Sequence, residues 1–230
     1  RAFPDRSKKF LIDQVKKELP DFDVDKHFTP SYNPWEQRMC LIPNSDFFNA
    51  IKDKSATVVT DHIEAFEENG IKLKSGDFLE ADIIVTATGL VLQNFGGVNI
   101  SVNNNPVNVS QTMTYKSLMY SDIPNFVNSF GYINASWTLK ADLTSTYLCR
   151  LIKHMDQNNY LSACPRKPLD VDETYDWLKD FSSGYIQRSI GLHPQQGSKK
   201  PWVNYQDYIK DWFDVKFSKL EDGNLIFSKD

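Results

Sequence analysis

The sequence predicts an α/β fold with a helical C-terminal extension, and three observations support this prediction. Consecutive apolar residues from Ile83 to Val85 are typical of a strand buried on both faces, as in a parallel sheet. Between residues 139 and 155 an apolar residue recurs at every fourth position, which is the spacing of a helix that packs along one face. Residues 161–230 contain further helical patterns, and these predict the extension.

The composition is that of an ordinary globular protein. The 230 residues are 40% hydrophobic and 24% charged, enough for one large domain or two small ones. The formal net charge of −4 argues against a nucleic-acid partner, because such binders normally carry a basic surface. The 15 Phe, 10 Tyr and 5 Trp suit an apolar cavity or an interface, although thick cores would also explain them.

The cysteines and the N-terminal residues indicate the cellular compartment that we expect for this chain. Cys40, Cys149 and Cys164 lie far apart and lack the spacing of metal ligands, so we expect no metal site, a reducing compartment and a cytoplasmic location. The first ten residues contain no apolar signal core, and no apolar run approaches membrane-spanning length, so we expect no integral membrane segment. The first residue is Arg rather than Met, and we expect a piece of a longer protein.

The N-terminal region is predicted to contain two helices joined by a long loop. Residues 7–19 have helical apolar spacing, with Ser7 as a possible cap and Pro20 as the stop. Residues 27–43 are rich in aromatic residues and proline, and irregular loops of this length are often functional. A second, short helix is expected at 45–53.

The following region is predicted to form strands. Extended segments at 55–60, 62–68 and 71–74 precede the apolar run 81–89. The Asn69-Gly70 pair between two of them is a strong hairpin signal, and a Ser-Gly pair repeats it.

The second half is predicted to be mainly helical. Residues 90–125 are irregular, with short strands, and 124–132 resembles another buried strand that ends in a glycine. A helix follows from about 138 to 155. The C-terminal extension is expected to hold helices at 170–181 and 204–213.

Two weak signals point to a nucleotide site. Ligands of open parallel sheets bind beyond the carboxyl ends of the strands, where the small residues Thr86 to Gly89 follow the apolar run. A helix starting near Thr138 directs free N–H groups toward a phosphate or the carbonyl edge of a flavin. Gly89 as a simple turn and Ser136 as a simple cap are the competing interpretations. Together the two signals describe half of a dinucleotide site.

Five segments carry a resemblance that covers essentially the whole chain in order. They resemble the C-terminal part of class B flavoprotein monooxygenases, specifically the Baeyer–Villiger monooxygenases of the ethionamide-activating type. The segments are HFTPSYNPWEQRMCLIPNSDFF, VVTDHIEAFEENGIKLKSG, EADIIVTATGL, GYINASWTLKADL and WVNYQDY.

The resemblance implies a two-dinucleotide-binding-domain flavoprotein, with Rossmann-like FAD and NAD(P) domains. Residues 1–54 would be the returning segment of the NADP domain with the active-site loop, 55–160 the C-terminal half of the FAD domain, and 161–230 the extension. FAD and NADPH are the implied cofactors. The implied reaction inserts one oxygen atom of O2 into a ketone, or oxidises a sulfide, through a C4a-peroxyflavin.

The resemblance assigns the catalytic role to Arg38. This residue lies in NPWEQRMCL, the segment that matches the family's active-site arginine. A peroxide anion needs a permanent, preorganised positive charge, and a guanidinium keeps its charge in a partly dry site. Without the resemblance, an exposed or salt-bridged arginine would be the preferred interpretation.

The other site residues also come from the resemblance. Thr88 and Gly89 match a segment near the FAD, and Thr138 and Leu139 match the helix start that faces the isoalloxazine ring. The substrate pocket is assigned to three aromatic residues, each of which could instead be ordinary packing: Tyr32, Trp35 and Trp137.

Three motifs of the family are missing from this sequence. It has neither the Gly-x-Gly-x-x-Gly fingerprint for FAD nor the second glycine motif for NADPH, and it lacks the Phe-x-Gly-x-x-x-His-x-x-x-Trp signature. Without the loop that cradles the pyrophosphate, we expect the chain to be inactive unless the missing N-terminal half is supplied.

Two alternative functions remain open. The first is a flavin-dependent NAD(P)H reductase without oxygenation, although no Cys-x-x-x-x-Cys pair supports its disulfide-reducing version. The second is a non-catalytic interaction module that uses the aromatic residues of the C-terminal extension.

Overall fold

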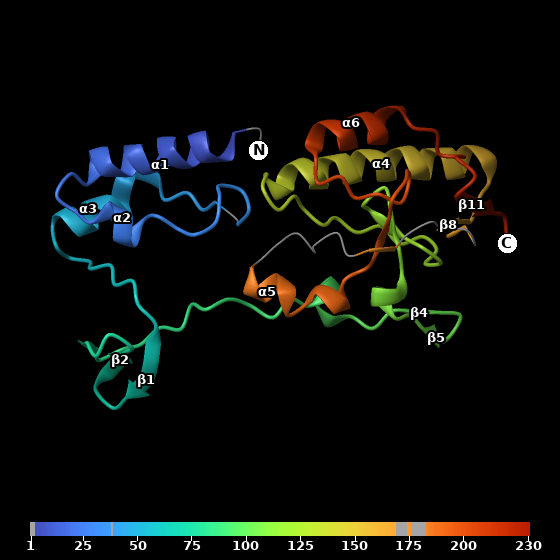
Figure 1. Cartoon of the computed structure of the whole chain (residues 1–230). Coiled ribbons are helices and arrows are strands. Elements are labelled where there is room, and N and C mark those ends of the chain that lie inside the picture. The colour runs from blue at the N-terminus through green and yellow to red at the C-terminus, as the bar shows by residue number, and fades with distance from the viewer. Residues whose placement is uncertain (1–2, 38, 169–173, 176–182) are drawn as a thin grey trace. The chain divides into compact units, whose positions relative to one another are not determined.

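The chain contains two compact units, residues 1–89 and residues 90–230 (Figure 1). The computed structural model describes residues 3–37, 39–168, 174–175 and 183–230. Both units combine helices with small sheets, so the expected mixed α/β class is confirmed. The three expected domains, with boundaries after residues 54 and 160, stay a prediction.

Three helices build most of the first unit. They are α1 (Pro4–Glu18), α2 (Val24–His27) and α3 (Asp46–Lys52), and α1 and α3 confirm the two helices predicted here. Ser7 is not the cap of α1, because the helix begins three residues earlier. A proline in its first turn has a backbone angle already suited to a helix and lacks only an N–H that would be unpaired.

A three-stranded antiparallel sheet completes the first unit. Its strands β1 (Ile63–Glu67), β2 (Gly70–Leu73) and β3 (Phe78–Glu80) follow one another in space as in sequence. The predicted hairpin at Asn69-Gly70 is confirmed, since Glu67 pairs with Gly70. A Cβ atom at Gly70 would collide with the carbonyl oxygen of Leu79, which explains the glycine.

The predicted strands at 55–60 and 81–89 are wrong for this structure. Neither segment belongs to a strand, and the side chains of Ile83 and Val85 are each 82% exposed. All pairings between the described strands are antiparallel, so the expected parallel sheet is also not observed. The physical reason is that a strand exists through a ladder of hydrogen bonds to a neighbouring strand, and the described residues supply no such ladder for these two segments.

Short hairpins open the second unit, as predicted for residues 90–125. The strands are β4 (Ser101–Val102) with β5 (Asn105–Pro106), and β6 (Thr114–Tyr115) with β7 (Met119–Tyr120).

The strand predicted at 124–132 is wrong. Its backbone bonds go to different places, from the Asn125 N–H to the Ala163 carbonyl at 3.0 Å and from the Asn128 N–H to the Leu118 carbonyl at 2.9 Å. The segment is therefore a half-buried loop that bonds to two neighbouring segments and forms a strand ladder with neither.

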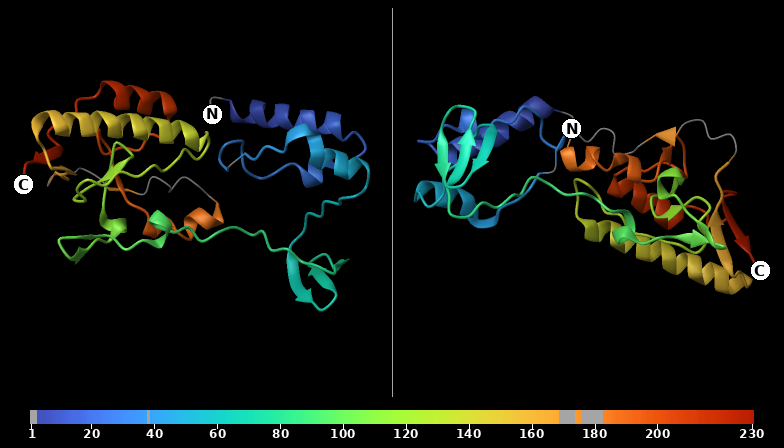
Figure 2. Two further views of the ribbon diagram at one scale, coloured as in Figure 1. Left: turned by 180° about the vertical axis from the view of Figure 1, so that it is seen from behind. Right: turned by 90° about the horizontal axis from the view of Figure 1, so that it is seen from below.

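Helix α4 (Trp137–Asn158) is the longest element and confirms the predicted helix. Leu143, Tyr147 and Leu151 of its apolar stripe are buried, and α6 (Tyr208–Phe217) packs alongside it (Figures 1 and 2). Their shared core also contains residues of the β6–β7 hairpin and of the C-terminal strands. The core members are Met113, Tyr115, Leu118, Met119, Leu143, Tyr147, Leu151, Ala163, Trp202, Val215 and Leu225.

The C-terminal extension is less helical than predicted. Strand β8 (Ser162–Pro165) pairs with β11 (Leu225–Ser228), and β9 (Thr174–Tyr175) pairs with β10 (Gln196–Gly197). The helix predicted at 170–181 lies outside the described residues except at Thr174 and Tyr175. The helix predicted at 204–213 is α6, which starts at residue 208 because Asp207 caps it.

The remaining described elements are single turns of helix: α5 (Gly184–Gln187) and the 3₁₀ turns η1 (Pro43–Ser45), η2 (Asn94–Gly97), η3 (Val109–Gln111) and η4 (Ile190–Leu192). None of the helices within the described ranges is long and apolar enough to cross a membrane.

Adjacent residues of α4 give a test of this core. Leu151 is 3% exposed, whereas Ile152 is 49% exposed. We expect Leu151→Ala to lower the free energy of unfolding by about 2–5 kcal/mol, because the truncation leaves a cavity. Ile152→Ala removes a similar side chain from the surface and should cost below about 1 kcal/mol. Urea unfolding followed by tryptophan fluorescence measures both, and equal losses would contradict this packing.

Candidate functional site

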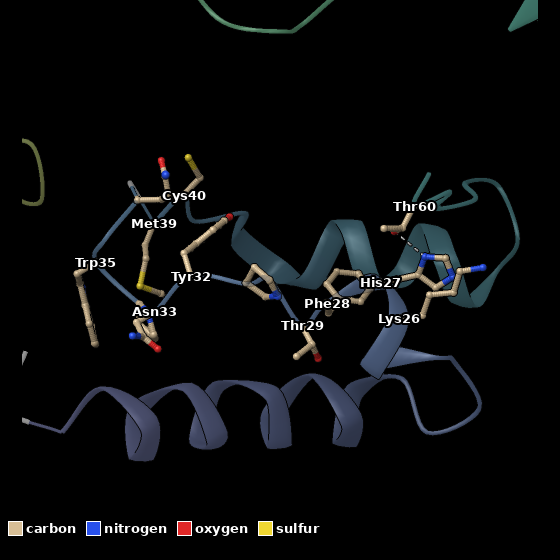
Figure 3. A pocket seen from close by; sticks show the side chains of 13 residues that line it. Lys26, His27, Phe28, Thr29, Tyr32, Asn33, Trp35, Met39, Cys40 and Thr60 are labelled. Atoms are coloured by element: carbon tan, nitrogen blue, oxygen red, sulfur yellow. Dashed lines mark hydrogen bonds between the residues drawn. The ribbon is translucent and has the colours of Figure 1, made fainter. Parts of the chain in front are cut away.

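Tyr32 and Trp35 line a groove in the first unit, formed by the loop between α2 and α3 (Figure 3). Its volume is about 590 Å³, within the range of small-molecule sites. Both aromatic side chains are partly exposed, at 44% for Tyr32 and 37% for Trp35. The structure thus brings these two predicted pocket residues together.

A tight turn holds Trp35 in the groove. Glu36 donates its N–H to the Asn33 carbonyl at 3.2 Å. In return its carboxylate accepts the backbone N–H of Asn33 at 2.8 Å and the side-chain amide at 3.0 Å. Trp35 lies inside this turn with φ of 68°, a left-handed conformation that is uncommon for a bulky residue and needs support from its neighbours.

The two ends of the groove differ in chemistry. Trp35 and Met39 lie at one end, and Lys26, His27 and Thr60 lie at the other (Figure 3). Nδ1 of His27 is 2.9 Å from the Thr60 hydroxyl. An apolar molecule with one polar group therefore matches the lining.

Arg38, the predicted catalytic residue, lies outside the described residues. Its sequence neighbours Gln37 and Met39 both line the groove.

The predicted cofactor residues Thr138 and Leu139 lie in the first turn of α4, and both are exposed. Ser136 occupies the N-cap position but makes no side-chain capping bond. Its hydroxyl is instead 2.6 Å from the Thr138 hydroxyl. The interpretation of Ser136 as a simple cap is therefore wrong. Because the first N–H groups of a helix have no partner within it, this helix start can donate hydrogen bonds to a ligand.

Trp137 packs on the chain segment before α4. Its ring centroid lies 5.3 Å from that of Phe130, and a Cβ atom at Gly131 would collide with the indole. Gly131 therefore permits the close approach, while 49% of Trp137 stays exposed. Trp137 shares the start of α4 with the cofactor residues.

Thr88 and Gly89 lie at the end of the exposed segment 81–89. Gly89 has φ of 113°, which favours glycine and agrees with a turn of the chain. The predicted residues thus fall into three local groups, at the groove, at the start of α4 and at this segment.

These residues fit only part of an FAD molecule. The uncapped start of α4 provides donors for a ring carbonyl, and the small residues before Gly89 leave the backbone accessible. The sequence has no glycine fingerprint for the pyrophosphate. The chain therefore fits the flavin ring better than the phosphates.

A buried ion pair beside the start of α4 was not predicted. Nζ of Lys140 lies 2.7 Å from Oδ2 of Asp211 on α6, and the two side chains are 2% and 5% exposed. The Tyr132 hydroxyl donates to the same oxygen at 2.7 Å. Burial is the main cause that raises the pKa of Tyr132, and this bond to a carboxylate raises it further. A sequence signal existed, because Lys140 precedes Leu143 by three positions and so lies on the buried stripe of the helix.

Comparisons with known proteins find relatives along the whole chain. It is 46% identical to an FAD-containing monooxygenase EthA of Mycolicibacterium smegmatis, over 100% of this chain and 46% of that protein. A probable FAD-binding monooxygenase AlmA of an Acinetobacter species is 44% identical over 100% of this chain and 46% of that protein. A putative FAD-containing monooxygenase MymA of Mycobacterium tuberculosis is 41% identical over 99% of this chain and 46% of that protein.

The expected resemblance to flavin-containing monooxygenases is therefore confirmed. The chain spans about half the length of the curated relatives it matches. No family model and no solved structure matches it.

The turn around Trp35 makes a pH-dependent prediction. The hydrogen bonds from Asn33, the backbone one first, lower the pKa of Glu36 below its ordinary value of 4.5. Since the charged form is the bound form, the contribution of these bonds is present above the ordinary pKa and is lost as the pH falls through the lowered one. Asn33→Ala removes the side-chain amide but keeps the backbone N–H, so we expect it to raise the pKa of Glu36 part of the way toward its ordinary value in an NMR titration.

Asn49→Ala is the matched control, because the Asn49 amide donates to the Asn44 carbonyl and not to a carboxylate. An unchanged Glu36 titration in the Asn33 variant would contradict the described turn.

Proposed function

We propose that this chain, whose sequence matches FAD-containing monooxygenases from end to end, provides the C-terminal portion of an FAD- and NADPH-dependent monooxygenase of the Baeyer–Villiger type. The observation that carries the proposal is the identity of 41–46% to such proteins over 99–100% of the chain. Within it, residues 1–54 would return from the NADP domain, 55–160 would complete the FAD domain, and 161–230 would form the C-terminal extension.

The flavin contacts are proposed to come from two segments. The free N–H groups at the start of α4, around Thr138 and Leu139, would donate to a carbonyl oxygen of the ring, where negative charge accumulates when the flavin is reduced. Thr88 and Gly89 present little side chain, so their backbone would approach the cofactor closely. FAD, when bound, would take electrons from NADPH and activate O2.

The groove is proposed to hold the ketone or sulfide. Tyr32 and Trp35 offer apolar surface for the body of the substrate. The family resemblance assigns Trp137 to the substrate pocket as well. Arg38 would hold a fixed positive charge beside the reacting oxygen, because a guanidinium keeps its proton in a partly dry site.

The exposed segment 81–89 supports the view that the chain works as part of a larger protein. Its apolar residues are typical of a strand buried on both faces, yet Ile83 and Val85 are 82% exposed here. The relatives are about twice as long, and we propose that this segment pairs with strands contributed by sequence outside the chain. The fragment alone would then lack both the sheet and the pyrophosphate loop, and would be inactive.

A complementation experiment tests the proposed function. We expect the 230-residue chain alone to retain no flavin absorbance after gel filtration. Co-expression with the N-terminal half of one of its relatives should give a complex that retains it, because that half would supply the phosphate-binding loop. Tight FAD binding by the isolated chain would contradict the prediction that the chain is inactive without the N-terminal half. A stable complex that shows no flavin absorbance would overturn the assignment of FAD as the cofactor.

Product analysis separates oxygenation from plain reduction. With NADPH, O2 and a ketone or sulfide, the complex should form oxygenated product. Consumption of NADPH without such a product would instead favour the reductase.

The role of Arg38 is tested in the same complex. We expect Arg38→Ala to leave flavin reduction by NADPH intact but to reduce oxygenated product by about a hundredfold or more, because a fixed charge at the reacting oxygen is lost. Arg6→Ala, which removes an exposed arginine from α1, is the control. Unchanged product formation by Arg38→Ala would remove its assigned role.

A further inference from the structure

A single carboxylate oxygen accepts hydrogen bonds from the two residues that flank the segment 133–139. Oδ2 of Asp211 accepts the hydroxyl of Tyr132, just before the segment, and the ammonium of Lys140, just after it, both at 2.7 Å. The segment between them contains Trp137, Thr138 and Leu139. All three residues proposed to line the cofactor or substrate site at the start of α4 therefore lie between two anchors on the same atom.

A third bond from the C-terminal extension reaches the same segment. The backbone N–H of Ile133 donates to the side-chain oxygen of Gln206 at 3.0 Å. Gln206 and Asp211 flank the start of α6, where Asp207 caps the helix through the N–H groups of Ile209 and Lys210. The segment is therefore attached to a rigid helix start rather than to a free loop.

Burial makes this attachment specific. Taken as whole residues, Tyr132 is 1% exposed, Lys140 2% and Asp211 4%, and Nζ of Lys140 lies 5.6 Å from the centre of the Tyr132 ring. In such surroundings a carboxylate and an ammonium are removed from water, so each needs its partner. Alternative arrangements of the segment would leave a buried charge unpaired, so the geometry allows essentially one position.

We propose that Asp211 is a positioning residue, which sets the start of α4 against the flavin ring by fixing Tyr132 and Lys140. This inference rests on the proposed function, since it takes the start of α4 as the flavin contact. It gives the C-terminal extension a role in the site: α6 contributes the anchor but no ligand contact.

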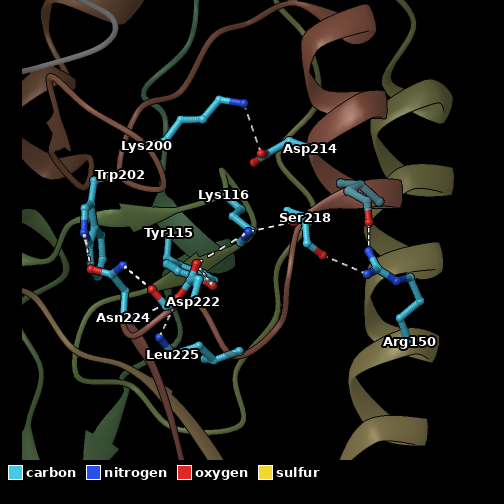
Figure 4. A network of polar contacts seen from close by, with 11 residues as sticks. Tyr115, Lys116, Arg150, Lys200, Trp202, Asp214, Ser218, Asp222, Asn224 and Leu225 are labelled. Atoms are coloured by element: carbon cyan, nitrogen blue, oxygen red, sulfur yellow. Dashed lines mark hydrogen bonds and ion pairs between the residues drawn. The ribbon is translucent and has the colours of Figure 1, made fainter.

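The same unit contains a second Tyr–Lys–Asp cluster, which serves as an internal control. The Tyr115 hydroxyl donates to Oδ2 of Asp222 at 2.7 Å, and Nζ of Lys116 lies 3.6 Å from that oxygen (Figure 4). Lys116 also donates to Ser218 after α6. This cluster ties the β6–β7 hairpin to the C-terminus and does not include the segment 133–139.

Hydrogen exchange of the 230-residue chain tests the anchor without a cofactor. We expect Tyr132→Phe to accelerate exchange of the hydrogen-bonded amides at the two ends of this segment, those of Ile133 and of the α4 turn that follows Lys140, by about tenfold, because a hydrogen bond to a charged group is lost. Tyr115→Phe should leave them unchanged and act on the β6–β7 hairpin. Unchanged exchange in Tyr132→Phe, or equal acceleration of both regions by both variants, would overturn the anchor.

The flavin-loaded complex tests the positioning. The absorbance spectrum and the reduction potential of bound FAD should shift in Tyr132→Phe and in the more severe Asp211→Asn, and stay as in the parent in Tyr115→Phe. A parent complex that retains FAD, with the same spectrum and potential in all variants, overturns the positioning role alone. A parent complex that retains no FAD overturns the proposed function together with this role, while the exchange data still decide whether Asp211 holds the segment.

Discussion

The buried contact of Asp211 with Lys140 and Tyr132 is the interaction on which the second unit most depends. It joins α6 to the first turn of α4 in the only way that suits a buried lysine, by giving its charge a partner. Apolar packing along Leu143, Tyr147 and the rest of the core supplies most of the driving force. Apolar contacts are not directional, however, and would tolerate small rotations of one helix on the other. The ion pair does not tolerate such rotations.

The sequence patterns that need only local information predicted the fold well. The four-residue apolar spacing of α4 and the Asn69-Gly70 turn each act within a few residues, and the structure contains the helix and the turn that they indicate. The segment 81–89 shows where such prediction ends. An apolar run indicates that a segment is suited to form a buried strand. The strand forms only if other strands are available to pair with it.

The candidate site was predictable to the extent that a resemblance could supply it. Tyr32 and Trp35 share a groove, and Trp137 accompanies Thr138 at the helix start, although composition and spacing alone gave no reason to group them. Lys140 was missed because a lysine in an amphipathic helix is normally assigned to the exposed face. Its partner Asp211 is 71 residues away in the chain, a separation that no local pattern spans.

The exposed segment after β3 has a further consequence for the chain in solution. From Ile83 to Gly89 it contains no charge and no proline, and its backbone has no sheet partner among the residues that the structure describes. Segments of this composition readily form intermolecular β-structure when they are unpaired. Glu80 and Asp82 stand immediately before the run. Two copies aligned in parallel and in register would bring these carboxylates together, and their repulsion opposes that form of aggregation without adding a contact to the fold.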